Sequence, residues 1–314
     1  MLILEPWFFP IAVLAVAALM LLISFLIFLK IFFAVRREPR RKEEFPIPEG
    51  AIYEAHREQM VEWMKEIRAM ERTDHSILSY DGLRLCGKYY EYKKGAPIEI
   101  LFHGYRGTAE RDLCGGVHRC FSIGHNALIV DQRAAGTSEG HVITFGERER
   151  RDCLAWVDYV IENIDKDARI ILTGISMGAA TVMMAASMEL PPNVIGVLAD
   201  CGYTSTKEII QKVIRDMKLP AKPIYPLVKL GAKLFGGFDP DAFSPLASMK
   251  QCKLPVIFFH GDTDDFVPCH MSEENHAACA AERKRLVIIH GAGHGLCFPV
   301  DQETYLKELR DFFP

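Results

Sequence analysis

Short apolar runs alternate with helical stretches through most of this chain, and that alternation restricts its possible folds more than any other feature. The runs predicted as strands are Ile98–His103, Ala127–Asp131, Arg169–Gly174, Val194–Asp200, Pro255–His260 and Leu286–His290. The stretches predicted as helices are residues 111–123, 146–164, 177–189, 271–282 and 301–312. Strands without polar alternation are buried on both faces, and their alternation with helices is typical of a parallel sheet covered on both sides. We therefore expect an α/β fold with a mostly parallel, doubly wound sheet and a site at the carboxyl ends of its strands.

The first 35 residues differ from the rest because they are almost entirely apolar. No charge occurs from Phe8 to Leu29, and Lys30 alone interrupts the apolar character before residue 36. About 20 apolar residues are enough to cross a bilayer. A cleaved signal peptide is the alternative, but the run lacks a leading positive charge and a following small-residue cleavage pattern. We expect residues 1–35 to be a transmembrane anchor, with Trp7 at the membrane interface.

The residues after this segment indicate its orientation. Five basic residues follow it: Arg36, Arg37, Arg40, Arg41 and Lys42. Because basic flanks stay on the cytoplasmic side, we expect a single-pass protein of the cell membrane with a cytoplasmic catalytic domain. The nine cysteines agree, since an odd, scattered set without a C-x-x-C pair indicates a reducing compartment. The net charge of −4 and the lack of a basic domain argue against nucleic acid as a partner.

Residues 36–74 are predicted to be a charged linker followed by an amphipathic helix over residues 51–72. The apolar residues of that helix recur at near-helical spacing, so we expect it to pack on the domain. Residues 75–314 form the predicted catalytic domain, which opens with a hairpin around Asp81-Gly82.

One connection in this domain is longer than a compact fold requires. It separates the strand that ends at Asp200 from the strand that begins at Pro255, and insertions of this size are commonly lids or binding elements. We expect residues 203–249 to form a helical cap over the cleft. Its apolar residues, Leu227 and Leu230 among them, are then expected to bind substrate.

Gly174-Ile175-Ser176-Met177-Gly178 follows a predicted strand and opens a helix rich in Ala and Met. This is the strand–turn–helix context of a nucleophile elbow. The turn is so tight that side chains at the two glycine positions would clash. Ser176 is therefore the candidate nucleophile, and a serine hydroxyl needs an adjacent base at neutral pH.

The base is expected on a loop after the last strand, where Gly291-Ala292-Gly293-His294-Gly295 lies. Small neighbours would let the His294 imidazole move between nucleophile and leaving group. The acid should precede this histidine in the chain. Asp262, Asp264 and Asp265 follow the penultimate strand, and Asp200 ends an earlier one. The residues alone do not choose among these four carboxylates.

A developing oxyanion needs preorganised donors. The backbone N–H of Met177, at a helix start directly after the nucleophile, is one candidate. The other is the N–H of Tyr105, in the loop after the first long strand. The side chain of Arg106 in the same loop is a candidate for substrate binding.

Five motifs in order resemble the α/β-hydrolase superfamily, in particular bacterial single-pass hydrolases related to prolyl-oligopeptidase-like esterases and depalmitoylase-type proteins. They are H-G-Y-R-G (103–107), D-Q-R-A-A-G-T-S-E-G (131–140), G-I-S-M-G (174–178), H-G-D-T-D-D-F-V-P (260–268) and G-A-G-H-G (291–295). The resemblance implies an α/β-hydrolase fold with a helical cap insertion. It also implies a triad of Ser176, Asp264 and His294, because the family pattern H-G-x-x-D-x-x-V-P assigns the acid to Asp264.

The reaction implied is hydrolysis of an acyl ester or thioester through an acyl-serine, as in carboxylesterases and thioesterases. A peptidase, an amidase or an acyltransferase could use the same triad, and a non-catalytic binding domain is a third alternative. The apolar cap and the anchor favour small-molecule substrates with lipophilic acyl groups. His103, His260 and His290 each end a predicted strand, but we expect no metal there. No cofactor motif is present.

Overall fold

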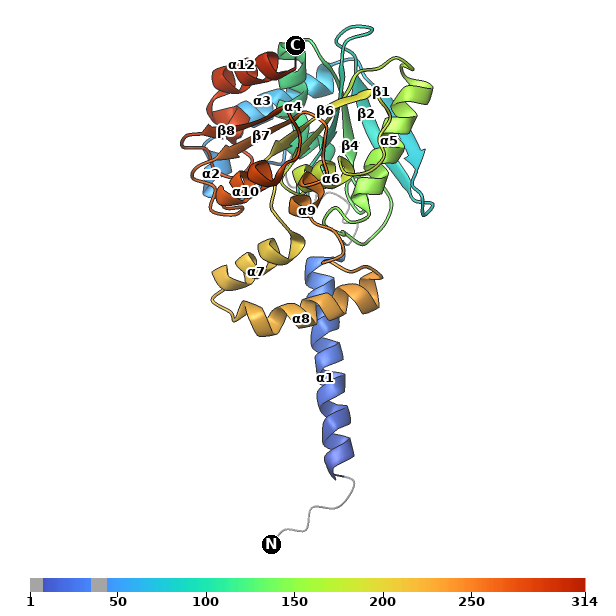
Figure 1. The fold of residues 1–314 in the computed structure, drawn as a ribbon, viewed down its shortest axis with the longest axis vertical. Coiled ribbons are helices and arrows are strands. Elements are labelled where there is room, and N and C mark those ends of the chain that lie inside the picture. Colours follow the sequence, from blue (N-terminus) through green and yellow to red (C-terminus); the bar gives the residue numbers. More distant parts are fainter. Residues whose placement is uncertain (1–7, 35–43, 314) are drawn as a thin grey trace.

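The computed structural model describes residues 8–34 and 44–313. A long helix, α1 (Phe8–Ile31), projects from a rounded α/β domain (Figure 1). It is uncharged except for Lys30, and most of its side chains from Phe9 to Leu22 are exposed. Trp7 and the five basic residues after the predicted anchor lie outside the described residues.

One eight-stranded sheet runs through the domain in the order β1-β2-β4-β3-β5-β6-β7-β8. The strands are β1 (Thr73–Leu78), β2 (Arg84–Tyr90), β3 (Ile98–Phe102), β4 (Asn126–Asp131), β5 (Ile170–Ile175), β6 (Val194–Asp200), β7 (Val256–Gly261) and β8 (Lys284–Ile289). The β1–β2 and β2–β4 pairs are antiparallel, and the other pairs are parallel. The predicted hairpin and the six predicted strands are all present, so the expected mostly parallel sheet is confirmed.

Helices cover both faces of the sheet because successive strand residues point to opposite sides. On β3, Ile100 packs with α5 (Glu149–Asn163) and α6 (Met177–Ala185), whereas Leu101 packs on the other side. That second side is covered by α3 (Arg57–Ala69), α4 (Ala109–Ser122) and α12 (Gln302–Phe312). The remaining helices beside the sheet are α9 (Pro245–Met249), α10 (His270–Ala278) and α11 (Cys297–Val300). The helix predicted over 51–72 is interrupted after Glu54, which leaves the short α2 (Ala51–Glu54) before α3.

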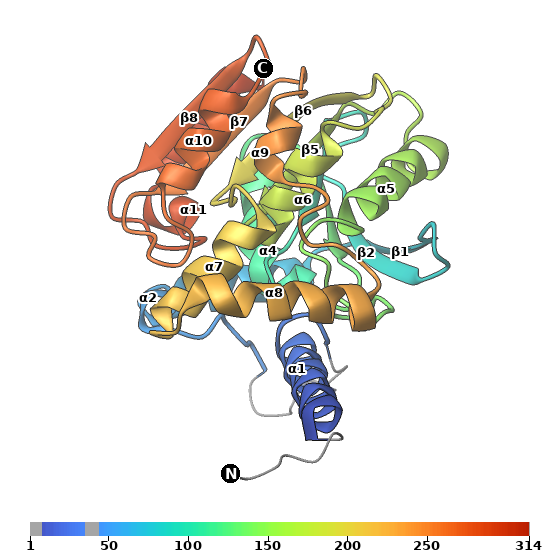
Figure 2. The same cartoon turned by 60° about the horizontal axis from the view of Figure 1, so that its bottom comes forward.

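A third apolar core joins α1 to the domain. Phe28 of α1 and Phe32, which follows the helix, are buried with residues of α6, α7 (Thr206–Asp216) and α8 (Ala221–Gly231). The α8 helix continues into one π-helical turn, η1 (Ala232–Gly236). Both views show α8 lying crosswise against α1 at the lower edge of the domain (Figures 1 and 2). The predicted cap segment is therefore helical, but its helix α8 packs against α1.

A buried charge cluster supports the sheet beside the helix α4. Glu99 of β3 pairs with both terminal nitrogens of Arg119, at 2.6 and 3.1 Å. It also bonds His125 at 2.9 Å and the Thr173 hydroxyl at 2.7 Å. Burial alone would raise the pKa of Glu99, but Arg119 and His125 hold it well below its usual range. The carboxylate is therefore ionised at neutral pH.

Glu99→Gln is expected to lower the free energy of unfolding at pH 7 by about 3–5 kcal/mol, because it leaves the Arg119 charge buried without a counterion. A depressed pKa stabilises the fold above the unfolded-state pKa and loses that effect as the pH falls. The difference in the free energy of unfolding between Glu99→Gln and the natural chain should therefore become smaller below roughly pH 4. Urea unfolding at pH 7 and at acidic pH measures it, with the exposed Glu162→Gln as control. Equal stabilities of natural chain and variant at pH 7 would contradict the expectation.

Candidate active site

Ser176 lies at the turn between β5 and α6, in a backbone conformation that side chains rarely adopt. Its φ is 56° and its ψ is −116°, which is costly for a residue with a Cβ atom. The flanking glycines make the turn possible. A Cβ on Gly174 would lie 2.2 Å from the Gly178 backbone, and one on Gly178 would lie 2.0 Å from the Phe102 carbonyl oxygen. The sequence therefore holds the Ser176 side chain at the carboxyl edge of the sheet.

Three predicted residues meet at this edge. The His294 Nε2 atom is 2.9 Å from the Ser176 hydroxyl oxygen, and its Nδ1 atom is 2.7 Å from Asp264 Oδ2. Because a carboxylate only accepts hydrogen bonds, Nδ1 carries the proton and Nε2 is free to accept from the serine. All three residues are buried. This arrangement can activate the hydroxyl for attack on a carbonyl carbon.

The other candidate acids have different partners. Asp262 accepts hydrogen bonds from His290 Nδ1 and from the Gly291 N–H, at 2.8 and 2.7 Å. Asp200 accepts one from the Tyr305 hydroxyl at 3.0 Å, and burial raises the pKa of its carboxyl. Asp265 belongs to the lining of the pocket, and its backbone carbonyl accepts from Lys212. Of the four carboxylates left open by the residues, Asp264 is the one bonded to His294.

The Asp264 carboxylate is fixed by its own loop. Its Oδ1 atom accepts from the N–H groups of Phe266 and Val267, at 2.9 and 2.8 Å. Burial would raise the pKa of Asp264, but bonds from His260 and His294 hold it well below its usual range. His260 is thus a supporting residue that the sequence did not reveal as one. Its Nε2 atom is 3.2 Å from Asp264 Oδ2 and 2.8 Å from the Val267 carbonyl oxygen.

The loop of the predicted oxyanion donors also lies beside the nucleophile. A Cβ on Gly104 would lie 3.5 Å from Ser176 Cβ, so the backbone before Tyr105 approaches the serine closely. His103 fixes this backbone, since its Nδ1 atom donates to the Gly104 carbonyl at 2.7 Å and its Nε2 atom accepts from Gln132 N–H at 3.0 Å. Met177 is the first residue of α6, so its N–H belongs to the amides that a helix start leaves unpaired.

The side chains of Tyr105 and Arg106 in that loop bond to the C-terminal end of α1 and the residues after it, although Tyr105 also lines the pocket. The Tyr105 hydroxyl donates to the Ile31 carbonyl at 2.6 Å. Arg106 donates to the carbonyls of Lys30 and Phe33, at 2.8 and 3.1 Å, and to the Tyr105 hydroxyl at 2.8 Å. These bonds satisfy carbonyls that the end of a helix leaves unpaired. The expected place of Arg106 in the substrate cleft is corrected accordingly, because it is not among the residues that line the pocket.

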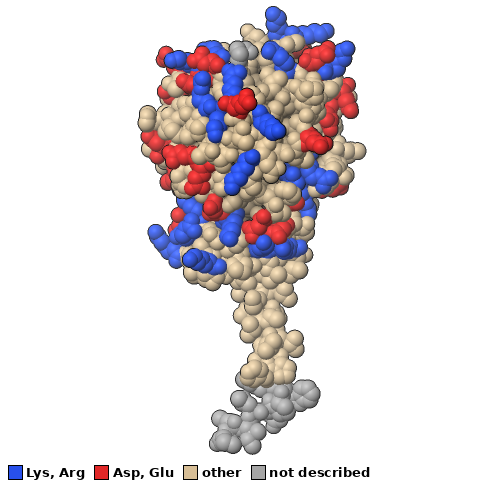
Figure 3. Space-filling model, viewed as in Figure 1, with Lys and Arg blue, Asp and Glu red and all other residues tan. Residues whose placement is uncertain are grey.

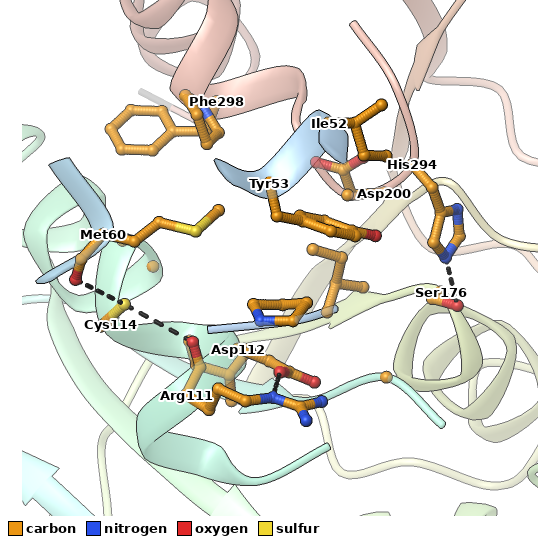
Figure 4. Close-up of a pocket in the computed structure, with 18 of the residues that line it drawn as sticks. Ile52, Tyr53, Met60, Arg111, Asp112, Cys114, Ser176, Asp200, His294 and Phe298 are labelled. Carbon is orange, nitrogen blue, oxygen red and sulfur yellow. Dashed lines mark hydrogen bonds and ion pairs between the residues drawn. The ribbon is translucent and has the colours of Figure 1, made fainter. Parts of the chain in front are cut away.

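A pocket of about 650 Å³ opens beside Ser176 and His294 (Figure 4). Its apolar wall comes mainly from the segment before the sheet and from α11: Ile52, Tyr53, Met60, Trp63 and Phe298. Ile52 lies against the loop of the base, since a Cβ on Gly293 would lie 3.2 Å from its Cδ1 atom. The amphipathic helix predicted to pack on the domain does so, and its N-terminal part also covers the pocket.

The cap segment does not line this pocket. Leu227 and Leu230 are absent from its lining, as is every other residue from 203 to 249, all of which are described. The expected cap-to-cleft contact is therefore corrected, since α8 is occupied by α1. One link remains, because the Lys212 ammonium of α7 donates to the Asp265 carbonyl at the pocket mouth.

Tyr53 is a pocket residue that the sequence did not identify. Its ring lies between the apolar wall and the Ser176–His294 pair, with the hydroxyl pointing toward that pair (Figure 4). Burial raises the pKa of Tyr53, and the negative charges of Asp264 and Asp112 add to the effect. The phenol therefore stays protonated and can donate a hydrogen bond. An aromatic residue in a short helix far from the motifs carries no signal of this role.

The three strand-end histidines do not converge. His103 and His260 have the separate partners given above, and exposed His290 pairs with Asp262. In the described part of the chain, one group has metal-ligand spacing: Cys201, Asp264 and His294, with ligand atoms within 4.8 Å of one another. Burial holds the pKa of the Cys201 thiol well above its usual value, so it stays protonated. This chemistry favours the hydrogen-bonded triad over a cation site.

Comparisons with known proteins identify the family and the fold of this chain. The family described as "Alpha/beta hydrolase family" matches residues 100–308. "Uncharacterized protein YqkD" of Bacillus subtilis is 27% identical over 248 residues, which cover 77% of this chain and 79% of that protein. "Uncharacterized protein Rv2307c" of Mycobacterium tuberculosis is 28% identical over 244 residues, covering 76% and 78%.

Among solved structures, the esterase Pf2001 of Pyrococcus furiosus superposes with a TM-score of 0.66 at 23% identity, covering 85% of this chain and 95% of that one. Est1E of Butyrivibrio proteoclasticus, solved with ferulic acid bound, gives 0.58 at 22% identity, covering 76% and 97%. At these identities the similarity concerns the fold.

Proposed function

The chain belongs to the alpha/beta hydrolase family, and from that premise we propose that it is a serine hydrolase that cleaves acyl esters or thioesters through an acyl-Ser176 intermediate. The observation that carries the proposal is the hydrogen-bonded series Ser176–His294–Asp264 at the edge of an apolar pocket. Labelling of the purified chain by a fluorophosphonate probe, together with hydrolysis of ester substrates, tests it.

In the proposed reaction, His294 Nε2 takes the Ser176 proton as the hydroxyl oxygen attacks the acyl carbon. The N–H groups of Tyr105 and Met177 stabilise the resulting oxyanion. The Asp264 carboxylate keeps the imidazole in its productive tautomer and stabilises the imidazolium that forms. His294 then protonates the leaving alcohol or thiol, and a water molecule activated by the same histidine releases the acid from Ser176.

The pocket supports an apolar acyl group as the substrate moiety. Its volume is within the range of ligand pockets, roughly 300–1,000 Å³. Ile52, Met60 and Trp63 would contact the acyl chain beyond the carbonyl carbon. The acyl-binding wall is thus assigned to the segment before the sheet in place of the cap.

Ile52→Ala is expected to lower kcat/KM for long-chain esters by about tenfold or more and to affect acetyl esters least, because each methylene-scale contact contributes roughly 1–3 kcal/mol. Ile52 is 42% exposed, so its truncation should leave the fold intact. A series of p-nitrophenyl esters of graded chain length measures the change in detergent solution. Leu227→Ala, which alters a comparable side chain outside the pocket, is the matched control. A uniform loss in Ile52→Ala, or a shifted preference in Leu227→Ala, would speak against this pocket assignment.

We further propose that α1 crosses the cell membrane and that the hydrolase domain is cytoplasmic. The helix has 23 residues of mean hydropathy 3.0 from Phe9 to Ile31, and basic residues follow it. All nine cysteines are free, which fits a reducing compartment. Protease added to intact spheroplasts should leave the domain uncut, whereas it should digest the domain after lysis. Cleavage in intact spheroplasts would place the domain outside.

A further inference from the structure

We propose that the outer face of α8 and η1, residues 219–236, is a membrane-docking surface that rests in the headgroup region of the bilayer crossed by α1. The inference rests on the proposed membrane span of α1 and adds a second contact with lipid. Its partner is the lipid surface itself, with a preference for anionic headgroups.

The first argument is the position along the axis of α1 at which α8 contacts it. A Cβ on Gly231 would lie 2.4 Å from the Ser24 carbonyl oxygen and 3.3 Å from Phe28 Cβ. The ring of Phe235 contacts that of Phe25 at a centroid distance of 4.9 Å. At 1.5 Å per residue, the 20 residues from 8 to 27 span about 30 Å, which is the thickness of a bilayer's hydrocarbon core. The crossing point therefore lies at the boundary between acyl chains and headgroups.

The second argument is the distribution of side chains around α8. Ala221, Tyr225, Val228 and Ala232 recur at spacings of four, three and four residues and are buried in the core shared with α1 and α6. Pro223, Leu227, Leu230 and Leu234 repeat the same spacings, are offset by two residues, and are exposed or half-buried. Since two residues turn a helix by about 200°, this second stripe points away from the domain.

The exposed stripe is apolar where a solvated helix would be polar. Leu234 is 56% exposed, and Met217 and Leu219, which precede α8, are 51% and 45% exposed. Figure 2 shows α8 at the edge of the domain from which α1 projects. A stripe that points away from the domain therefore faces the side from which α1 projects. That is the direction of the proposed bilayer, so the apolar surface is continuous with the membrane-spanning surface of α1.

The third argument is charge. Residues 206–236 contain seven basic and two acidic residues, although the whole chain has a net charge of −4. Lys222, Lys229 and Lys233 lie on one flank of the helix, at spacings of seven and four, beside the apolar stripe. Two aspartates just after this range pair with the lysines: Asp239 with Lys229 and Lys233, at 3.1 and 2.7 Å, and Asp241 with Lys229 at 2.6 Å. Basic side chains are visible along the lower edge of the domain, directly above the uncharged shaft of α1 (Figure 3). A basic flank beside an apolar face is the pattern of helices that lie in an interface.

Lipid contact can be measured on the full chain in nanodiscs made with phospholipids brominated near the top of the acyl chain. Cys86 and Cys269 are the two cysteines that are not buried, and Cys86→Ser with Cys269→Ser gives a background for specific labelling. A fluorophore is placed at Leu234→Cys or Met217→Cys. Leu14→Cys, in the exposed part of α1, reports the span itself. Leu78→Cys, on a side chain that is 72% exposed in β1, is the aqueous control.

We expect quenching of the fluorophore by brominated lipid at positions 234 and 217 to exceed that at position 78 by about threefold or more. The reason is that an interfacial helix sinks its apolar face roughly 5–10 Å into the headgroup boundary. Anionic lipid should increase it. Quenching at position 14 without quenching at 234 and 217 would overturn the docking surface and leave the span intact. No quenching at position 14 would overturn the span and the docking surface together. Energy transfer between labels at position 234 of two chains, without quenching by brominated lipid, would show that the outer face of α8 binds a second copy of the chain and would overturn the proposal.

Discussion

Ser176→Ala is expected to lower kcat/KM for ester hydrolysis by about 10⁴-fold or more, because it removes the hydroxyl on which the proposed acyl intermediate forms and leaves only binding and oxyanion stabilisation. The substitution removes one oxygen from a buried turn whose backbone is held by Gly174 and Gly178. Fold and stability should therefore change little. Fluorophosphonate labelling followed by mass spectrometry, with initial rates on an ester, measures the loss.

Ser187→Ala is the matched control for this change. Ser187 follows α6, and its hydroxyl donates to the Met184 carbonyl at 2.9 Å, away from the pocket. Ser187→Ala should react with the fluorophosphonate probe and hydrolyse the ester at the same rate as the natural chain. Stoichiometric labelling of Ser176→Ala at another residue would show that Ser176 is not the nucleophile.

Asp264→Asn is expected to lower kcat by about 10⁴-fold, because an amide can present an N–H to His294 and stabilise the wrong imidazole tautomer. The proton would then reside on Nε2, where it faces the serine that must give up its own. The effect should fall on kcat more than on KM, since Asp264 is bonded to the base and does not line the pocket. Steady-state kinetics over a range of ester concentrations separates the two constants.

Asp262→Asn provides the comparison within the same loop. Its carboxylate bonds His290 and the Gly291 N–H, at the exposed side of the loop. We expect its rate to remain within about threefold of the natural chain, as for most exposed substitutions. Full activity in Asp264→Asn, or a collapse in Asp262→Asn, would assign the acid to another carboxylate.

Local patterns were sufficient to predict the sheet and the loops that hold the triad. Strands buried on both faces must be continuously apolar, and parallel strands bring their carboxyl ends to one edge. Ser176, Asp264 and His294 each follow such a strand, so their meeting follows from the topology. Choosing Asp264 required the family motif, because Asp262 lies only two residues earlier in the same loop after β7.

The position of the cap could not be predicted in this way. The sequence predicts Leu227 and Leu230 in the cleft because a long apolar insertion must cover another surface, but sequence spacing does not say which surface. The structure pairs α8 with α1, which is nearly 200 residues away in the chain. The same applies to Arg106, whose acceptors are the carbonyls of Lys30 and Phe33. Tyr53 and Ile52 reach the pocket through the path of the chain after the linker, which no local pattern specifies.

Three hydrogen bonds from Tyr105 and Arg106 to the carbonyls of Lys30, Ile31 and Phe33 join the loop after β3 to the C-terminal end of α1 and the residues that follow it. If α1 spans the membrane as proposed, these bonds give it a mechanical role. A flexible tether would leave the hydrolase indifferent to its lipid surroundings. Here the residue whose N–H is proposed to receive the oxyanion is joined through its own hydroxyl to α1, the proposed membrane span. A helix adjusts to a thicker or thinner bilayer by tilting or shifting. In the proposed arrangement, such a movement of α1 would either break these bonds or carry Tyr105 with it, and membrane thickness would then alter the position of the proposed oxyanion donor.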